Sequence, residues 1–215
     1  ALKAKLAEYG VACVSGWYSG RLAEGTLEDE LTNCAAHMAR LQAQGCKVVV
    51  YGEVAGSIQG RIDTPLFKRP RFTTDAQWQA YARKLNGFGE HLKTAYGITL
   101  AYHHHMGAYV ESPADVDRLM AETNHHVGLL FDTGHAWFGG GAPDPLPLLK
   151  KHIQRVVHVH CKDVRPQVVA TARNDAWSFL NAVINGTFTV PGDGAIDFDA
   201  VLRTLHGAGY QGWLV

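Results

Sequence analysis

The hydrophobic positions of this chain fall into short apolar runs, separated by longer segments in which apolar residues recur every three or four positions. Short runs of this kind are typical of β-strands, and the three-to-four spacing is typical of helices that bury one face. The predicted strands are Val11–Tyr18, Lys47–Val54, Ile98–His105, Val127–His135, Val156–Val164 and Gly212–Val215. Strands that alternate with helices indicate parallel β/α units.

Capping residues mark the ends of the predicted helices. Ser, Thr and Asp before an apolar helical stretch accept hydrogen bonds from its first free N–H groups. The first predicted helix is Leu2–Tyr9, and five more begin at Thr26, Thr74, Ser112, Asp175 and Asp197. The helix that begins at Asp175 runs to Asn185-Gly186. The polar stretch Ala55–Thr73, punctuated by Pro and Gly, predicts a loop over the mouth of a site.

Polar residues gather where the predicted strands end, as in Asp132 to His135 and His160 to Asp163. In a doubly wound sheet only the strands near the switch point should show this, whereas in a closed barrel every strand end faces one mouth. The pattern therefore predicts a (β/α)₈ TIM barrel forming a single domain over residues 1–215. Such barrels typically need about 250 residues and eight strands, so we expect about six of the eight strands here, with two N-terminal strands and the end of the last strand missing, as in a fragment of a longer chain.

The composition excludes several classes of protein. Twenty Lys and Arg residues balance 20 Asp and Glu residues, which argues against nucleic-acid or acidic-membrane partners. No stretch approaches the roughly 20 apolar residues of a membrane span. The four Cys residues form no C-x-x-C pair, which indicates reduced thiols in a cytoplasmic protein. The 12 His residues are unusual and cluster in the sequence.

The strongest local motif is His158-Val-His160-Cys-Lys162-Asp163. On a strand, residues 158, 160 and 162 point to one side, so two imidazoles and an ammonium share a face. Inside a barrel, a metal, a substrate or a paired charge is needed to stabilise such a set. Imidazole beside carboxylate favours Mn²⁺, Co²⁺, Fe²⁺ or Zn²⁺ over Mg²⁺ or Ca²⁺. The alternative is one buried histidine and a structural Lys–Asp pair.

Two further motifs follow predicted strands. In Phe131-Asp132-Thr133-Gly134-His135, Asp132 is a candidate metal ligand and His135 a ligand or substrate contact, although Asp132 could instead cap the next helix. In Tyr102-His103-His104-His105, alternation turns His103 and His105 to one face and His104 to the other. Glu111 could support this site or lie on the surface. Trp17, Tyr18 and Glu53, at the ends of earlier strands, are candidate substrate contacts, as are Glu111, His158 and Asp163.

Together these motifs resemble the xylose-isomerase-like barrel superfamily and, within it, the inosose dehydratase family. That resemblance implies a divalent metal, Mn²⁺ or Co²⁺, held by Glu, Asp, His and Glu at successive strand ends. Asp132 and His160 match the second and third ligands. His103 stands where the first Glu usually stands, and His103 and His105 both remain candidates for that position. The fourth ligand would lie past Val215.

The resemblance further implies a hydro-lyase that removes water from a cyclic keto-polyol, 2-keto-myo-inositol, in inositol catabolism. Candidate proton-transfer groups are His103, His105, His135 and Lys162, with base and acid left unassigned. A homo-oligomer is compatible with this reading. The alternatives are a ketose isomerase or epimerase, a phosphodiesterase of the apurinic-site endonuclease type, which the balanced charge disfavours, and a non-catalytic sugar-binding barrel.

Overall fold

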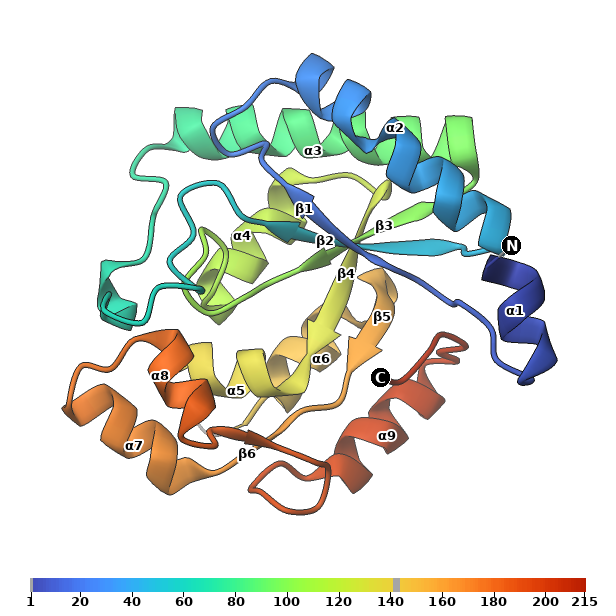
Figure 1. The fold of residues 1–215 in the computed structure, drawn as a ribbon. Coiled ribbons are helices and arrows are strands. Elements are labelled where there is room, and N and C mark those ends of the chain that lie inside the picture. Colours follow the sequence, from blue (N-terminus) through green and yellow to red (C-terminus); the bar gives the residue numbers. More distant parts are fainter. Residues whose placement is uncertain (1, 141–143) are drawn as a thin grey trace.

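The computed structural model describes residues 2–140 and 144–215 of the chain. Five parallel strands form one sheet in the order β1-β2-β3-β4-β5 (Figure 1). Each strand pairs with the next strand along the sequence, as in the wall of a barrel, and the order does not reverse as it does in a doubly wound sheet. The strands are β1 (Trp17–Gly20), β2 (Val48–Glu53), β3 (Thr99–His103), β4 (Val127–Asp132) and β5 (Val156–His160).

Helices connect these strands and cover the outer side of the sheet, with α2 and α3 packed against each other along it (Figure 1). Their bounds are α1 (Leu2–Glu8), α2 (Leu27–Gln44), α3 (Asp75–Tyr96), α4 (Pro113–Glu122), α5 (Thr133–Gly140), α6 (Leu146–His152), α7 (Pro166–Asn174), α8 (Phe179–Ile184) and α9 (Phe198–Gly207). Two 3₁₀ turns, η1 (Leu66–Lys68) and η2 (Ile153–Arg155), and an antiparallel pair, β6 (Asp163–Val164) with β7 (Phe188–Thr189), complete the described elements.

Four of the predicted helix starts are confirmed by their hydrogen bonds. Thr26 and Asp197 accept from the backbone N–H groups at the start of α2 and α9, and Thr74 and Ser112 form capping boxes at α3 and α4. The predicted start of a helix at Asp175 is wrong. Asp175 ends α7, and α8 begins after Ser178, because the segment folds as two short helices joined by a tight turn.

The strand predictions were too long at several ends. The first strand begins at Trp17, not at residue 11. The fourth ends at Asp132, because α5 starts at the next residue. The fifth ends at His160, and Asp163 begins the separate strand β6. In each case the predicted strand continues past a change of backbone direction that side-chain alternation cannot detect.

The C-terminal segment lies parallel to β5, as the next wall strand of a barrel does. Val159 and Leu214 form an isolated parallel bridge. Three backbone hydrogen bonds support it: Val159 N to Trp213 O, Val215 N to Val159 O and Cys161 N to Val215 O. The predicted strand 212–215 is thus paired at its expected position, with one bridge in place of a regular ladder.

The two faces of the sheet bury different side chains. A small cluster of Val50, Ala101 and Leu130 fills the inner face, and the large apolar core lies between the outer face and the helices. His103 and Asp132 lie two residues beyond Ala101 and Leu130, so the pleat aims them inward too. The inner face therefore changes from aliphatic to polar toward the C-terminal ends of the strands.

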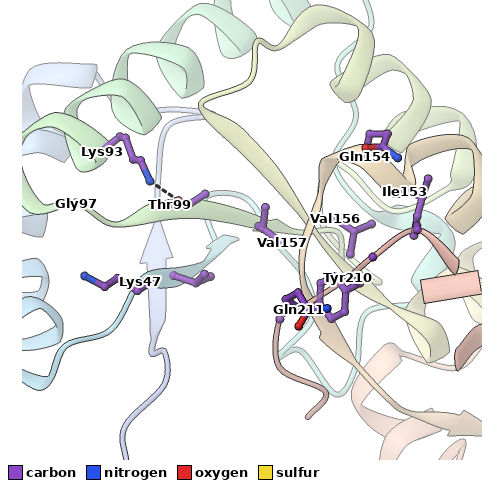
Figure 2. A pocket seen from close by; sticks show the side chains of 14 residues that line it. Lys47, Lys93, Gly97, Thr99, Ile153, Gln154, Val156, Val157, Tyr210 and Gln211 are labelled. Atoms are coloured by element: carbon purple, nitrogen blue, oxygen red, sulfur yellow. Dashed lines mark hydrogen bonds between the residues drawn. The ribbon is translucent and has the colours of Figure 1, made fainter. Parts of the chain in front are cut away.

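The opposite end of the sheet holds a cavity of about 510 Å³, which Figure 2 shows. Lys47, Thr99 and Val156 line it, at the N-terminal ends of β2, β3 and β5. Lys93 donates to Thr99 there, in the bond drawn dashed in Figure 2. This cavity is separated from the polar strand ends by the length of the strands. Among the described residues, no helix has the length and apolar character needed to cross a membrane.

Candidate metal centre and catalytic site

The C-terminal ends of β3, β4 and β5 bring three predicted ligands together. His103 ends β3, Asp132 ends β4 and His160 ends β5, where Asp132 and His160 are paired in register. Oδ2 of Asp132 lies 3.2 Å from Nε2 of His103 and 3.3 Å from Nδ1 of His160. A single carboxylate oxygen is therefore the centre of the cluster.

Asp132 also caps a helix, so its capping role is confirmed, and the cap leaves one carboxylate oxygen for the cluster. Its Oδ1 accepts from the backbone N–H of His135, 3.0 Å away, in the first turn of α5. Its other oxygen, Oδ2, remains for the imidazoles and for the ammonium of Lys162, which forms an ion pair with it. Asp132 is fully buried, and a buried carboxylate needs this number of partners.

The residues after Asp132 explain why Lys162 can approach it. Thr133 Oγ1 donates to the carbonyl oxygen of Lys162 at 2.7 Å and so joins the start of α5 to the turn after β5. At Gly134, an added Cβ would lie 2.7 Å from Cβ of Lys162 and 2.9 Å from the ring of Phe188. Glycine is needed there because two other segments pack directly against its backbone.

His105 and His135 form the wall beside this cluster, with ring centroids 4.0 Å apart. Both contact the backbone of Met106. The N–H of Met106 donates to Nδ1 of His135 at 3.2 Å, and Nδ1 of His105 lies 2.7 Å from the carbonyl oxygen of Met106. A carbonyl only accepts, so Nδ1 of His105 carries the proton and Nε2 has the lone pair. In His135 the assignment is reversed, and a neutral ring carries its proton on Nε2.

Burial keeps these imidazoles neutral. It lowers the pKa of His103 to about 3 and that of His105 to about 4, and it places the pKa of His135 well below its ordinary value. Burial opposes ionisation of Asp132 as well, but the neighbouring His135 and the Lys162 ammonium outweigh it and hold the pKa of Asp132 well below its usual range. The centre thus offers one carboxylate and several neutral imidazoles near pH 7.

This donor set fits a divalent cation. Donor atoms of His103, Asp132 and His135 all lie within 4.8 Å of one another, which agrees with ligand bonds of about 2.0–2.2 Å. His135 is the least suitable of the three, because its Nδ1 lone pair is used by Met106 and its Nε2 carries a proton. His160 suits the cation better. Its Nδ1 lies 3.4 Å from the Lys162 ammonium, which is already held between this nitrogen and Asp132.

The structure also shows where Trp17, His158 and the two candidate first ligands lie relative to the cluster. Trp17 lies at the mouth with its ring centroid 5.5 Å from that of His103, and 42% of its surface is exposed. His158 lies below His160 on the inner face, and burial lowers its pKa to about 4. Of the two predicted first ligands, His103 is beside Asp132. His105 is turned to Met106 and does not belong to the group of donors.

Tyr18 and Glu53 do not reach the site, contrary to the sequence prediction. Both point to the outer side of the sheet, because side chains alternate between the two faces and these two fall on the outer set, opposite to Val50. Tyr18 donates to Glu30 of α2. Glu53 is buried and accepts from the hydroxyl groups of Tyr51 and Tyr81, and burial raises its pKa to about 7.

Asp163 and Glu111 contact backbone rather than an open cleft. Asp163 accepts from the N–H groups of Val164, Gly192, Gly194 and Ile196 and so shapes the Pro191–Gly194 loop. Glu111 accepts from the N–H of Gly107 at 2.7 Å. Both were predicted to bind substrate, and both instead hold the turns beside the site.

Three residues that surround the site were not predicted from the sequence. Met106 acts through its backbone, which no side-chain pattern reports. Phe179 of α8 packs on His105 with centroids 4.9 Å apart, but the helix that carries it was predicted with the wrong start. Arg69 is 6% exposed although it lies in a polar loop, where an arginine is expected to be solvated.

Comparison with known proteins agrees with this architecture. The sequence profile of the family described as "Xylose isomerase-like TIM barrel" matches residues 1–215. Rhizopine catabolism protein MocC of Rhizobium meliloti is 46% identical over 215 residues, an alignment that covers the whole chain and 65% of that protein. Inosose dehydratase of Geobacillus thermodenitrificans is 43% identical over 215 residues, which cover the whole chain and 71% of the relative. The chain thus spans about two-thirds of the length of these relatives.

Solved structures share the fold at low sequence identity. A D-tagatose 3-epimerase-like protein superposes with a TM-score of 0.65 at 18% identity, covering 99% of this chain and 73% of the other. The IOLI protein, described with a binding zinc atom, gives a TM-score of 0.66 at 18% identity, covering 99% of this chain and 70% of the other. At this identity the similarity establishes the barrel architecture.

Proposed function

The chain belongs to the xylose isomerase-like TIM-barrel family, and from that premise we propose that it acts as a metal-dependent dehydratase, removing water from a cyclic keto-polyol such as 2-keto-myo-inositol in inositol catabolism. Its 43% identity to an inosose dehydratase supports this substrate class. The observation that carries the reaction type is the pair of opposite contacts to Met106, whose carbonyl faces Nδ1 of His105 and whose N–H faces Nδ1 of His135. Elimination of water needs one group that takes a proton and a second that gives one.

The proposed metal ligands are His103, Asp132 and His160. A nitrogen and oxygen set of this kind favours Mn²⁺ or Co²⁺ over Mg²⁺. The metal would supply Lewis-acid polarisation of the ketone oxygen, which makes the adjacent C–H bond acidic. Lys162, whose side chain is 35% exposed, would then turn from Asp132 to the mouth and donate to a substrate oxygen.

The two histidines of the wall perform the proton transfers in this proposal. Nε2 of His105 has the lone pair, so it takes the proton from the carbon next to the ketone. The electron pair of that C–H bond moves to form the new double bond, and the C–O bond to the β-hydroxyl breaks. Nε2–H of His135 protonates the departing hydroxyl, which leaves as water. The proton that His105 took then passes to His135, whose ring centroid lies 4.0 Å away, so both rings become neutral again. Burial keeps His105 neutral before the reaction, as its role as base requires, and favours the return of both rings to the neutral state.

A ketose isomerase or epimerase would use the same proton abstraction without expelling hydroxide. The test incubates the Mn²⁺-loaded protein with 2-keto-myo-inositol in D₂O and follows both ultraviolet absorbance and the mass of the recovered ketone. A dehydratase produces an absorbing unsaturated or diketone product. Recovered ketone that contains deuterium, with no absorbing product, would instead establish isomerase or epimerase chemistry and refute the proposal.

The proposal also includes the cellular setting and the partners of the enzyme. The free thiols of Cys13, Cys34, Cys46 and Cys161 fit the reducing cytoplasm. A small-molecule substrate fits a chain without excess positive charge. Incubation with DNA that contains abasic sites tests the phosphodiesterase alternative, and cleavage there would support it.

A further inference from the structure

Arg69 is a buried cation in the loop between β2 and α3. Its guanidinium forms ion pairs with Asp115, at 2.6 Å, and Glu111, at 3.3 Å, and donates to the carbonyl oxygen of Tyr109 at 2.9 Å. Its side chain is 2% exposed. A planar guanidinium can serve several acceptors at once, which an ammonium cannot do with the same geometry. Arg69 therefore holds the turn that precedes α4 by hydrogen bonds. It acts on Glu111 by charge, since its Nε makes no hydrogen bond, and through Asp115, which also accepts from the backbone N–H of Glu111 at 3.2 Å.

Glu111 in turn fixes one peptide plane of the site. Its Oε2 accepts from the N–H of Gly107, and that N–H belongs to the same peptide as the carbonyl of Met106. A peptide is planar and trans, so an N–H directed at Glu111 aims the carbonyl away from it. The carbonyl accepts there from Nδ1 of His105 at 2.7 Å.

Steric constraints do not select this orientation by themselves. Gly107 has φ +81°, in the region that glycine adopts at low cost, so the peptide before it can rotate more freely than at other residues. If this peptide flipped, its N–H would face Nδ1 of His105. That nitrogen would have to accept, and the proton would move to Nε2, the atom that takes the substrate proton in the proposed reaction.

We propose that Arg69 and Glu111 are positioning residues that hold the Met106–Gly107 peptide with its carbonyl toward His105 and so keep the lone pair on Nε2 of His105. The catalytic consequence rests on the proposed dehydratase function, but the proton position does not. The long loop 55–73 thereby acts on the chemistry without touching the reacting atoms.

The test measures the proton position directly, by ¹⁵N NMR of the histidine side chains in the whole chain, with the His105 signals assigned from the spectrum of His105→Gln. The wild type should have Nδ1 of His105 protonated. In Glu111→Ala this protonation should be partly or wholly lost, and kcat should fall about 10–100-fold, as for other outer partners of catalytic groups, with KM changed less than about twofold. Glu111→Gln keeps an oxygen that can accept from Gly107 and should restore most of both readouts.

Arg155 supplies the matched control. It is also a partly buried arginine that donates to backbone carbonyls, including those of Met120 and Val127, but at the N-terminal end of β4. Arg69→Met and Arg155→Met should both lower the melting temperature, and only Arg69→Met should change the His105 signals and kcat.

Unchanged His105 protonation in Glu111→Ala and Arg69→Met would overturn the proposal and leave both residues structural. If Glu111→Ala does not fold, the comparison of wild type, Glu111→Gln and Arg69→Lys decides. The lysine lacks the fork that holds Asp115 and the carbonyl of Tyr109, so the turn that carries Glu111 is no longer fixed and the variant should show the altered protonation. Should the wild type lack dehydratase activity while its NMR signals respond as expected, the proposed function fails and the positioning role stands.

Discussion

Asp132→Asn separates the role of the metal from that of the helix cap. Asn and Asp rank nearly equal as N-caps, and an amide oxygen at Oδ1 can still accept from the N–H of His135. The amide NH₂ would take the place of Oδ2, which now serves His103, His160 and Lys162. The substitution therefore preserves the start of α5 and removes the charge at the centre of the site.

The structure gives the size of both effects. A unit charge pair about 4 Å apart is worth about 4 kcal/mol at an effective dielectric constant of about 20. Lys162 can turn to water, since its side chain is 35% exposed, so we expect a net loss of only about 1–2 kcal/mol of unfolding free energy, or about 3–6 °C in Tm. A divalent metal bound to Asp132 cannot turn to water in this way. Losing about 4 kcal/mol or more of attraction lowers its affinity by about 10²–10³-fold or more.

The assays are calorimetric melting of the metal-free protein, titration with Mn²⁺, and kcat/KM for 2-keto-myo-inositol. Asp163→Asn is the matched control, because Asp163 is equally buried but accepts only from backbone N–H groups. It should lose stability and keep its metal affinity. If Asp132→Asn turns over like the wild type at low Mn²⁺, Asp132 is a helix cap alone, and the metal centre is refuted.

Three further predictions follow from the charges and burial of the site and core. A chelator should abolish activity, and Mn²⁺ or Co²⁺ should restore it better than Mg²⁺; full activity after verified metal removal would exclude a metal role. Burial lowers the pKa of His104 from 6.5 to about 3, so the unfolded chain protonates first as the pH falls below 6.5, and His104→Phe should remove up to about 5 kcal/mol of the resulting acid destabilisation. Identical acid-unfolding curves would contradict this. Burial raises the pKa of Glu53 from 4.5 to about 7, so its contribution to stability is present below pH 4.5 and is lost as the pH rises to about 7. Glu53→Gln should abolish this component, worth about 3 kcal/mol, and urea midpoints with the same pH dependence as the wild type would show that Glu53 does not titrate in this range.

Periodicity and capping residues predicted the architecture well because both are local properties. The strands β2 and β3 and the starts of α2, α3, α4 and α9 follow from side-chain alternation and from hydrogen bonds within a few residues. The short helices α5, α6 and α7 were not predicted. The reason is clearest in α5, which is buried along most of its length and therefore shows no alternation between polar and apolar faces.

The candidate ligands were also predictable, because parallel strands of one sheet must end at one edge. The sequence predicts Asp132, His160 and either His103 or His105 as ligands, and the structure places His103 beside Asp132. The failures at Tyr18 and Glu53 have the opposite cause. Both residues lie on strands as predicted, but alternation places every second side chain on the outer face, and an apolar run does not show which set faces inward.

The sequence by itself determined the order of β/α units, the residue types that can hold a metal, and the family to which the chain belongs. The tertiary structure alone decided which imidazole nitrogen carries a proton. That choice depends on the peptide of Met106, on Glu111 and on Arg69. Arg69 comes from a different loop, and its hydrogen bonds to Ala108 and Tyr109 span 39 and 40 residues of sequence. A hydrogen bond between backbone and side chain depends on position and direction in space, and neither is encoded in a local pattern of residue types.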